Sequence, residues 1–234
     1  MTALELRHLY AGYGKATVVR DLNLSVPEGA TVALLGPNGA GKTSTLGAVT
    51  GTVKVSSGSI LLHGVNIGRL STYQRANRGL VLVPEGRGVF PGLSVGENLA
   101  LSADSAHGVD AGWRREQMSR VYDMFPALRE RTRQRAGSLS GGEQQMLAMS
   151  RAFLSNPKVL LMDEISVGLA PLVVELLYDA VRQLKQDGTT IVLVEQYLTY
   201  ALKFADICYV MGKGSVSFVG EPDELRSGAA AAYL

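Results

Sequence analysis

The stretch Gly36-Pro37-Asn38-Gly39-Ala40-Gly41-Lys42-Thr43, followed by Ser44, decides the fold of this 234-residue chain. It follows Thr31–Leu35 (TVALL), an apolar run with the length of a buried strand. A helix is expected from about Lys42 to Val49, ending near Gly51. Glycines let the backbone curl so that several N–H groups point at one spot, and the helix directs its positive end there. The stretch therefore predicts a phosphate-binding loop.

Two side chains of this loop are suited to a nucleoside triphosphate. Lys42 supplies a point charge for the β- and γ-phosphates, and Thr43 offers a hydroxyl ligand to Mg²⁺. The alternative, an ordinary glycine-rich turn, is disfavoured by the position between a strand and a helix.

A second element consists of the apolar run 159–162 followed by Asp163 and Glu164. Ligands of open α/β sheets gather at the carboxyl ends of the strands. We expect Asp163 to hold Mg²⁺ through a water and Glu164 to orient or deprotonate an attacking water. Many strands end in an Asp that only caps a helix, so this pattern alone is a weak indication of a metal site. It becomes a strong one because the chain also contains the phosphate loop.

The rest of the chain predicts an α/β fold with two additions. Apolar runs at 80–83, 159–162 and 190–194 are typical of a parallel sheet that is covered on both faces, and 171–186 has helical periodicity. Residues 1–30 and 54–66 are expected to form short strands of a small antiparallel sheet. Residues 86–155 show no clear strand and contain two capping-box patterns, 94–97 and 140–143, which predict an inserted helical lobe.

Composition supports a large core and excludes some classes of partner. Apolar residues make up 46% of the chain and charged residues 19%, and the net charge of +2 is too small to indicate a nucleic-acid partner. The single cysteine, Cys208, forms no internal disulfide, fits a reducing cytosol and is expected to be buried. No apolar run is long enough to span a bilayer and the first residues do not form a secretion signal, so membrane work would require a partner.

The motif 139–145 (LSGGEQQ) resembles the signature of ABC-transporter ATPases, and the order of the three motifs matches that family. The resemblance implies a single domain, 1–234, with a mainly parallel P-loop NTPase core at 1–85 and 156–234 and a helical signature lobe at 86–155. It implies ATP and Mg²⁺ as ligands. It also implies that the signature grips the γ-phosphate of ATP bound to a second ATPase subunit, through Ser140, Gly141 and Gly142.

Other positions follow from the resemblance, some with departures. Tyr13 matches the aromatic residue that stacks on adenine, with Tyr10 as the alternative. Glu85 stands where the family usually has a glutamine that touches Mg²⁺ and senses the membrane partner. Gln196 stands where a histidine usually contacts the γ-phosphate; its amide still donates a hydrogen bond but cannot become charged. Ala170 replaces a frequent Asp, which removes one possible contact across the dimer.

The segment 83–99 (VPEGRGVFPGLSVGENL), with VEQ at 194–196, resembles the ATPases of bacterial importers for branched-chain and other hydrophobic amino acids. That resemblance implies a homo- or heterodimer on the cytoplasmic face of the cell membrane, beneath permease subunits and served indirectly by an extracytoplasmic solute-binding protein. Phe90 would lie near the groove for a permease helix or belong to the core. Alternatives are an ATPase of a urea or amide importer and an ABC ATPase without a transport role.

Overall fold

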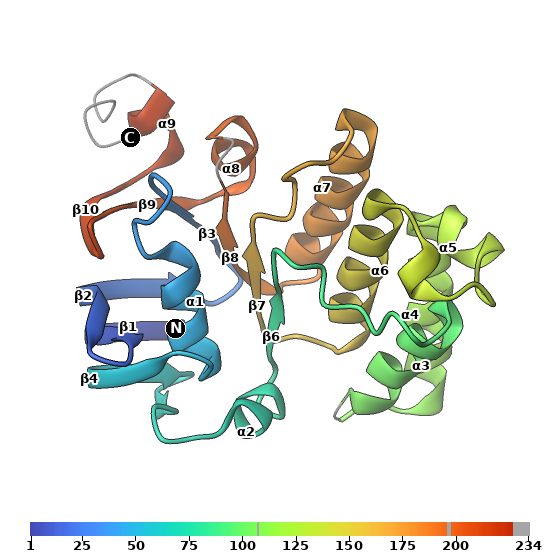
Figure 1. Cartoon of the computed structure of the whole chain (residues 1–234), viewed down its shortest axis with the longest axis horizontal. Coiled ribbons are helices and arrows are strands. Elements are labelled where there is room, and N and C mark those ends of the chain that lie inside the picture. Colours follow the sequence, from blue (N-terminus) through green and yellow to red (C-terminus); the bar gives the residue numbers. More distant parts are fainter. Residues whose placement is uncertain (107, 196–197, 227–234) are drawn as a thin grey trace.

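The computed structural model describes residues 1–106, 108–195 and 198–226. Within that part of the chain, a six-stranded sheet lies between a smaller antiparallel sheet and a group of helices, as Figure 1 shows. The predicted α/β class, with an antiparallel addition and a helical addition, is confirmed.

The six-stranded sheet is parallel except at one edge. Its strand order is β10-β9-β3-β8-β7-β6, and only β10 pairs in the antiparallel direction. Every residue of β3, β7 and β8 is buried, which is the condition that favours continuous apolar strands. In chain order the strands are β3 (Thr31–Leu35), β6 (Leu80–Val83), β7 (Val159–Asp163), β8 (Thr190–Val194), β9 (Ile207–Gly212) and β10 (Ser215–Gly220).

The antiparallel sheet has the order β2-β1-β4-β5. Its strands are β1 (Thr2–Tyr13), β2 (Ala16–Pro27), β4 (Lys54–Leu62) and β5 (Val65–Asn66). The expectation of short strands is wrong for β1 and β2, which have 12 residues each. The polar pair Arg7-His8 in β1 coincides with a shift of register in the pairing with β2, so one strand continues through it. Apolar side chains of β1 and β2 share a core with α1 (Lys42–Thr50) and the parallel sheet.

The helical part contains α3 (Val95–Ser105), α4 (Ala111–Met124), α5 (Pro126–Glu130), a short 3₁₀ turn η1 (Ala136–Ser138) and α6 (Gly141–Leu154). Both predicted capping boxes are present, at Ser94 and at Ser140. Apolar residues of α3, α4 and α6 form a second core that continues through α7 (Pro171–Gln186) to the sheet. The helical part is therefore packed onto the parallel sheet by α6 and α7.

Three short helices complete the described part of the chain: α2 (Thr72–Ala76), α8 (Leu198–Phe204) and α9 (Pro222–Arg226). Cys208 lies fully buried in β9, as predicted, and burial raises the pKa of its thiol to about 11. The thiol is therefore protonated near neutral pH and acts as a small apolar side chain. No helix among the described residues has the length and apolar character needed to cross a membrane.

Candidate nucleotide site

The phosphate loop joins β3 to α1 in a conformation that requires glycine at two positions. Gly36 has a φ of 138°, and a Cβ placed there would approach the Met211 carbonyl oxygen to 2.3 Å. Gly41 has a φ of 103° and is the N-cap of α1, with no side-chain cap. The helix start therefore presents its backbone N–H groups toward the loop, an arrangement that binds anions.

Lys42 is buried and folds back over its own loop. Its Nζ donates to the carbonyl oxygens of Gly36 (2.9 Å) and Pro37 (3.2 Å), and it lies 3.8 Å from Glu164 Oε1. The side chain of Lys42 is only 4% exposed, so the ammonium depends on these oxygen atoms for solvation. Phosphate oxygens entering the loop would offer it stronger partners than neutral carbonyls.

The carboxyl end of β7 lies beside the start of α1. Thr43 Oγ1 donates to Asp163 Oδ1 at 3.2 Å. Burial raises the pKa of Asp163, and the charges of Glu164 and Glu85 raise it further, against the opposing effects of the Thr43 hydrogen bond and Lys42. A buried carboxylate with acidic neighbours and an adjacent hydroxyl fits a small, hard divalent cation.

Among the residues that the structure describes, no cluster of three or more His, Cys, Asp and Glu side chains is arranged to hold a metal by itself. A magnesium ion at Thr43 and Asp163 would therefore take its other ligands from phosphate and water, as this cation usually does. Glu85 lies on the same small pocket but is exposed, so its direct ligation of the metal stays a prediction.

Most of the predicted phosphate-loop residues line a pocket of about 290 Å³, together with Glu85 and Glu164. The predicted residues Gly36, Pro37, Ala40 and Asp163 are not among the residues that line it. The structure adds one residue that sequence reasoning missed, Val18 of β2, which lies 3.6 Å from a Cβ built on Gly41. Tyr13 is 56% exposed at the end of β1 and does not line this pocket. The pocket is lined by Val18, Asn38, Gly39, Gly41, Lys42, Thr43, Ser44, Glu85 and Glu164.

The signature residues do not join this pocket. Ser140 is the N-cap of α6 and accepts from the Glu143 backbone N–H, while Glu143 accepts from the Ser140 backbone N–H at 2.8 Å. The backbone hydrogen bond from Ser140, helped by Arg131, holds the pKa of Glu143 below its ordinary value. Ser140 is exposed. Ser140, Gly141 and Gly142 are therefore not among the residues that line the phosphate-loop pocket of their own chain, and their contact with a phosphate stays a prediction.

The segment that follows β6 connects the phosphate-loop pocket to the signature helix α6. Arg87 has a left-handed φ of 68° and donates to Gln144 Oε1 of α6 at 2.8 Å. Arg151 of α6 donates to the Gly88 carbonyl and lies 4.5 Å from the centre of the Phe90 ring. Phe90 is 44% exposed, so it is a surface residue and not part of the core. Nothing in the sequence singled out Arg87 or Arg151.

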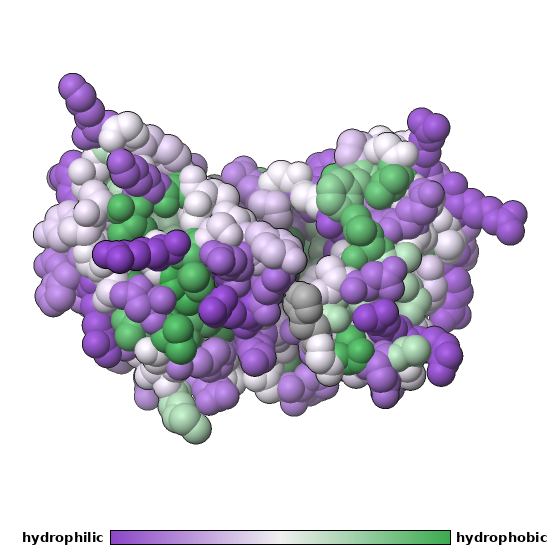
Figure 2. Space-filling model, turned by 90° about the horizontal axis from the view of Figure 1, so that it is seen from below, coloured by the Kyte–Doolittle hydropathy of each residue, from purple (hydrophilic) through white to green (hydrophobic). Residues whose placement is uncertain are grey.

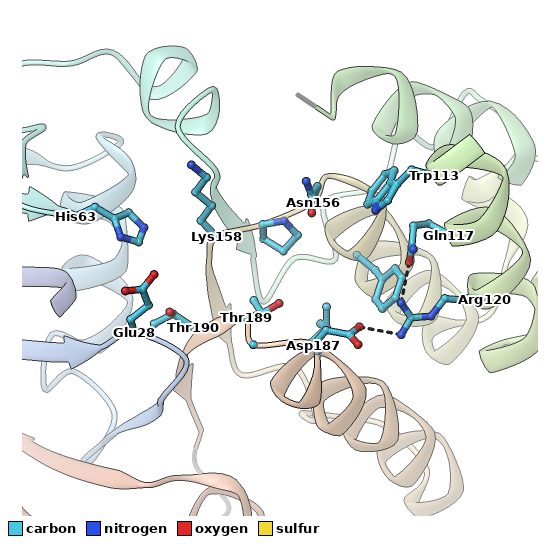
Figure 3. Close-up of a pocket in the computed structure, with 14 residues that line it drawn as sticks. Glu28, His63, Trp113, Gln117, Arg120, Asn156, Lys158, Asp187, Thr189 and Thr190 are labelled. Atoms are coloured by element: carbon cyan, nitrogen blue, oxygen red, sulfur yellow. Dashed lines mark hydrogen bonds and ion pairs between the residues drawn. The ribbon is translucent and has the colours of Figure 1, made fainter. Parts of the chain in front are cut away.

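A larger pocket, of about 660 Å³, lies near the amino ends of β7 and β8 (Figure 3). It shares no lining residue with the phosphate-loop pocket. Lys158, just before β7, Thr190 of β8 and Trp113 of α4 line it. Arg120 and Asp187, which form an ion pair at 2.8 Å, lie on the same side of the pocket as Trp113. None of the predicted site residues lines this pocket. On the face seen from below, the outline of the molecule narrows between the core and the helical part (Figure 2).

The remaining predictions from the family resemblance concern Gln196 and Ala170. Gln196 lies outside the described residues, so its contact with a phosphate stays a prediction. Ala170 is the N-cap of α7 and provides no side-chain cap, which agrees with a lost polar group at this position.

The family model described as ABC transporter matches residues 19–167, which is more than half of the chain. The chain therefore belongs to the ABC transporter family of ATP-binding proteins, and it binds and hydrolyses ATP. The fold and the phosphate-loop pocket described above agree with this class.

Named relatives share most of the length of the chain. It is 43% identical over 204 residues to the high-affinity branched-chain amino acid transport ATP-binding protein BraG of Pseudomonas aeruginosa, covering 87% of this chain and 86% of the relative. It is 36% identical over 218 residues to the probable branched-chain amino acid transport ATP-binding protein LivF of Archaeoglobus fulgidus, covering 93% and 91%. A solved structure of an ATP binding subunit of an ABC transporter superposes with a TM-score of 0.87 at 27% identity, covering 97% and 93%.

Proposed function

We propose that this chain is the ATP-hydrolysing subunit of an importer for branched-chain or other hydrophobic amino acids. The observation that carries the proposal is the meeting of Lys42, Thr43, Asp163 and Glu164 at one sheet edge, in a chain that is 43% identical to BraG. The first part supports the chemistry and the second supports the class of solute.

The residues of the pocket divide the work of phosphoryl transfer. The loop N–H groups and Lys42 bind the phosphates and stabilise the charge that develops on the transferred group. The Glu164 side chain is 10% exposed, and its Oε1 lies 3.8 Å from Lys42 Nζ. In this position the carboxylate can orient a water molecule and accept a proton from it. Thr43 and Asp163 would hold Mg²⁺, which neutralises phosphate charge when bound, with Glu85 beside them. Tyr13 and Gln196 are proposed for adenine and for the γ-phosphate.

A second cassette completes the site in this proposal. At the start of α6, Ser140 is exposed and Gly141 and Gly142 are half-buried, and none of the three lines the phosphate-loop pocket of its own chain. We propose that this helix start binds a phosphate held by another chain. Related cassettes have been solved as dimers, at 22–23% identity to this chain. We propose a homodimer or a dimer with a homologous ATPase that closes around two ATP molecules.

The membrane partner is proposed to be a pair of permease subunits, with the chain on the cytoplasmic face and a solute-binding protein acting indirectly. A groove of about 600 Å³ runs between α2, β6 and the end of α3, and Tyr73, which lines it, is 73% exposed. Because β6 leads directly to Glu85, a permease helix in this groove would act on the segment that borders the phosphate pocket.

The test is ATP turnover by the chain purified with its membrane partners in lipid vesicles, with a binding protein loaded with leucine or with urea. Stimulation by the leucine-loaded protein supports the proposal, and stimulation by urea alone selects the amide-importer alternative. Glu164→Gln is expected to reduce turnover by at least about 100-fold and to trap ATP-bound dimers. Unchanged turnover in this variant would overturn the assignment of Glu164.

A second candidate is the energising of lipid export, because the chain is 31% identical to the lipopolysaccharide export system ATP-binding protein LptB of Escherichia coli over 96% of its length. The identity is lower than to BraG, which favours amino-acid import. Turnover that responds to a lipid-exporting permease and to no loaded binding protein would reverse this order.

A further inference from the structure

The loop that follows Glu164 is fixed by a buried side chain outside the phosphate pocket. Glu195 comes directly after β8, is 1% exposed, and is not among the residues of the pocket. Its two carboxylate oxygens both contact Ser166: the Ser166 hydroxyl donates to Oε2 at 2.8 Å and the Ser166 backbone N–H lies 3.3 Å from Oε1. Ser166 is also buried, at 3% exposure.

The two ends of this loop are bound to consecutive residues of one strand end. The Glu164 backbone N–H donates to the Val194 carbonyl at 2.9 Å, and Ser166, two residues after Glu164, contacts Glu195, the residue that follows Val194. Glu164 itself has a left-handed φ of 48°, a conformation that non-glycine residues adopt only when their surroundings impose it. The end of β8 therefore acts as a template for the backbone that orients the Glu164 carboxylate.

The position of Glu195 requires a compensating interaction. Burial of a carboxylate is unfavourable unless the group is hydrogen-bonded. Ser166 supplies two donors to Glu195, its hydroxyl and its backbone N–H. Burial, and then the charge of Glu195, raise the pKa of the Tyr178 hydroxyl on α7 above its ordinary value. Because Glu195 and Ser166 are both buried, a change in the shape of the Glu195 side chain would be transmitted to the loop.

We propose that Glu195 is a positioning residue for ATP hydrolysis, which acts by gripping Ser166 and so fixing the direction of the Glu164 side chain. The inference rests on the proposed role of Glu164 as the residue that activates water. It predicts an effect on the chemical step and little effect on nucleotide binding, because neither Glu195 nor Ser166 lines the phosphate pocket.

The experiment compares Ser166→Ala, Glu195→Ala, the double variant and Glu195→Gln in the purified full chain with its membrane partners. We expect Ser166→Ala to lower kcat for ATP about tenfold while KM changes less than twofold. Glu195→Ala should lower kcat at least as much, and the double variant should be no slower than the slower single variant, since both remove one interaction. Glu195→Gln should stay within about threefold of wild type, because an amide of the same shape can contact both groups of Ser166.

Glu175→Gln is the matched control, since Glu175 is exposed on α7 and should leave kcat unchanged. Thermal unfolding and binding of a fluorescent ATP analogue show whether each variant is folded and loaded. Normal kcat in folded Ser166→Ala, or additive losses in the double variant, would overturn the inference. If Glu164→Gln itself leaves turnover unchanged, the proposed role of Glu164 fails; if only the Ser166 and Glu195 variants are silent, the positioning role alone fails.

Discussion

The helices α1 and α6 both begin at a motif that is predicted to bind phosphate, but they are stabilised in different ways. The start of α1 has no side-chain cap, and distant residues complete its surroundings: Val18 of β2 and Glu164 line the pocket, and Asp163 at the end of β7 accepts from Thr43. The start of α6 is capped within four residues by the capping box of Ser140. The surroundings of the α1 start are therefore built by the fold, whereas the α6 start is built by local sequence and is proposed to contact a second cassette.

The opposite end of α1 also depends on a distant residue. Arg75 of α2 is 3% exposed and donates to the Ala48 and Val49 carbonyls, both at 2.7 Å, and to the carbonyls of Gly68 and Leu70. A cation at a helix C-terminus is favourable for the helix dipole and for the carbonyls that lack partners there. Four predictions test this contrast between a helix fixed by tertiary contacts and one fixed by its own sequence.

The largest effect is expected at Lys42. Lys42→Ala removes the only cation of the phosphate-loop motif, so ATP turnover should fall by at least about 100-fold. The fall should appear both in steady-state turnover and in binding of labelled ATP. Lys54→Ala, which removes an exposed lysine at the start of β4, is the control and should keep normal turnover. Near-normal turnover in Lys42→Ala would contradict the assignment of the site.

The second effect is on stability. Arg75→Met keeps the length of the side chain but removes the guanidinium donor from the Ala48 and Val49 carbonyls, of which Ala48 keeps only the bond from the Gly51 N–H at 3.3 Å. We expect the free energy of unfolding to fall by about 3 kcal/mol. Urea denaturation measures this. Arg78→Met is the control, because Arg78 is exposed and makes one bond, to the Gln74 carbonyl at 3.2 Å. Equal losses in the two variants would show that burial of Arg75 is not the cause.

The third effect separates two roles of Ser140: capping of α6 and the proposed contact with a nucleotide on a second cassette. Ser140→Ala and Ser94→Ala each remove the N-cap of a capping box, on α6 and α3, and each should cost about 1 kcal/mol of stability. Only Ser140→Ala should also lower ATP turnover, while binding of ATP to the isolated chain stays normal. A similar loss of turnover in both variants would mean that helix stability, not contact with a second cassette, explains the effect.

The smallest effect depends on pH. The pKa of Glu143 is lower in the folded chain than its ordinary value of 4.5, so its stabilising contribution is complete above pH 4.5 and is lost as pH falls through the lower folded pKa. Glu143→Gln keeps an acceptor without the charge and should be less stable than wild type by about 0.5 kcal/mol at pH 7. Thermal unfolding against pH should show the difference shrinking in acid. For Glu116→Gln, an exposed control, no such trend is expected.

Local patterns in the sequence predicted the parts of the molecule that depend on neighbours along the chain. The glycines of the phosphate loop, the capping boxes at Ser94 and Ser140, and the buried strand before Asp163 all follow from backbone conformation and short-range hydrogen bonding. The convergence of the loop with Asp163 and Glu164 was also predictable, because the carboxyl ends of parallel strands meet at one edge.

Other features were decided only when distant segments packed together. The 12-residue length of β1 and β2 depends on pairing across register shifts, and Arg75 acts through carbonyls that lie 26 and 27 residues away. Glu195 follows an apolar strand just as Asp163 does, yet its partner is a serine 29 residues earlier. A pattern shows which side chain will be buried, but the identity of its buried partner is set by the sheet order, which local sequence does not encode.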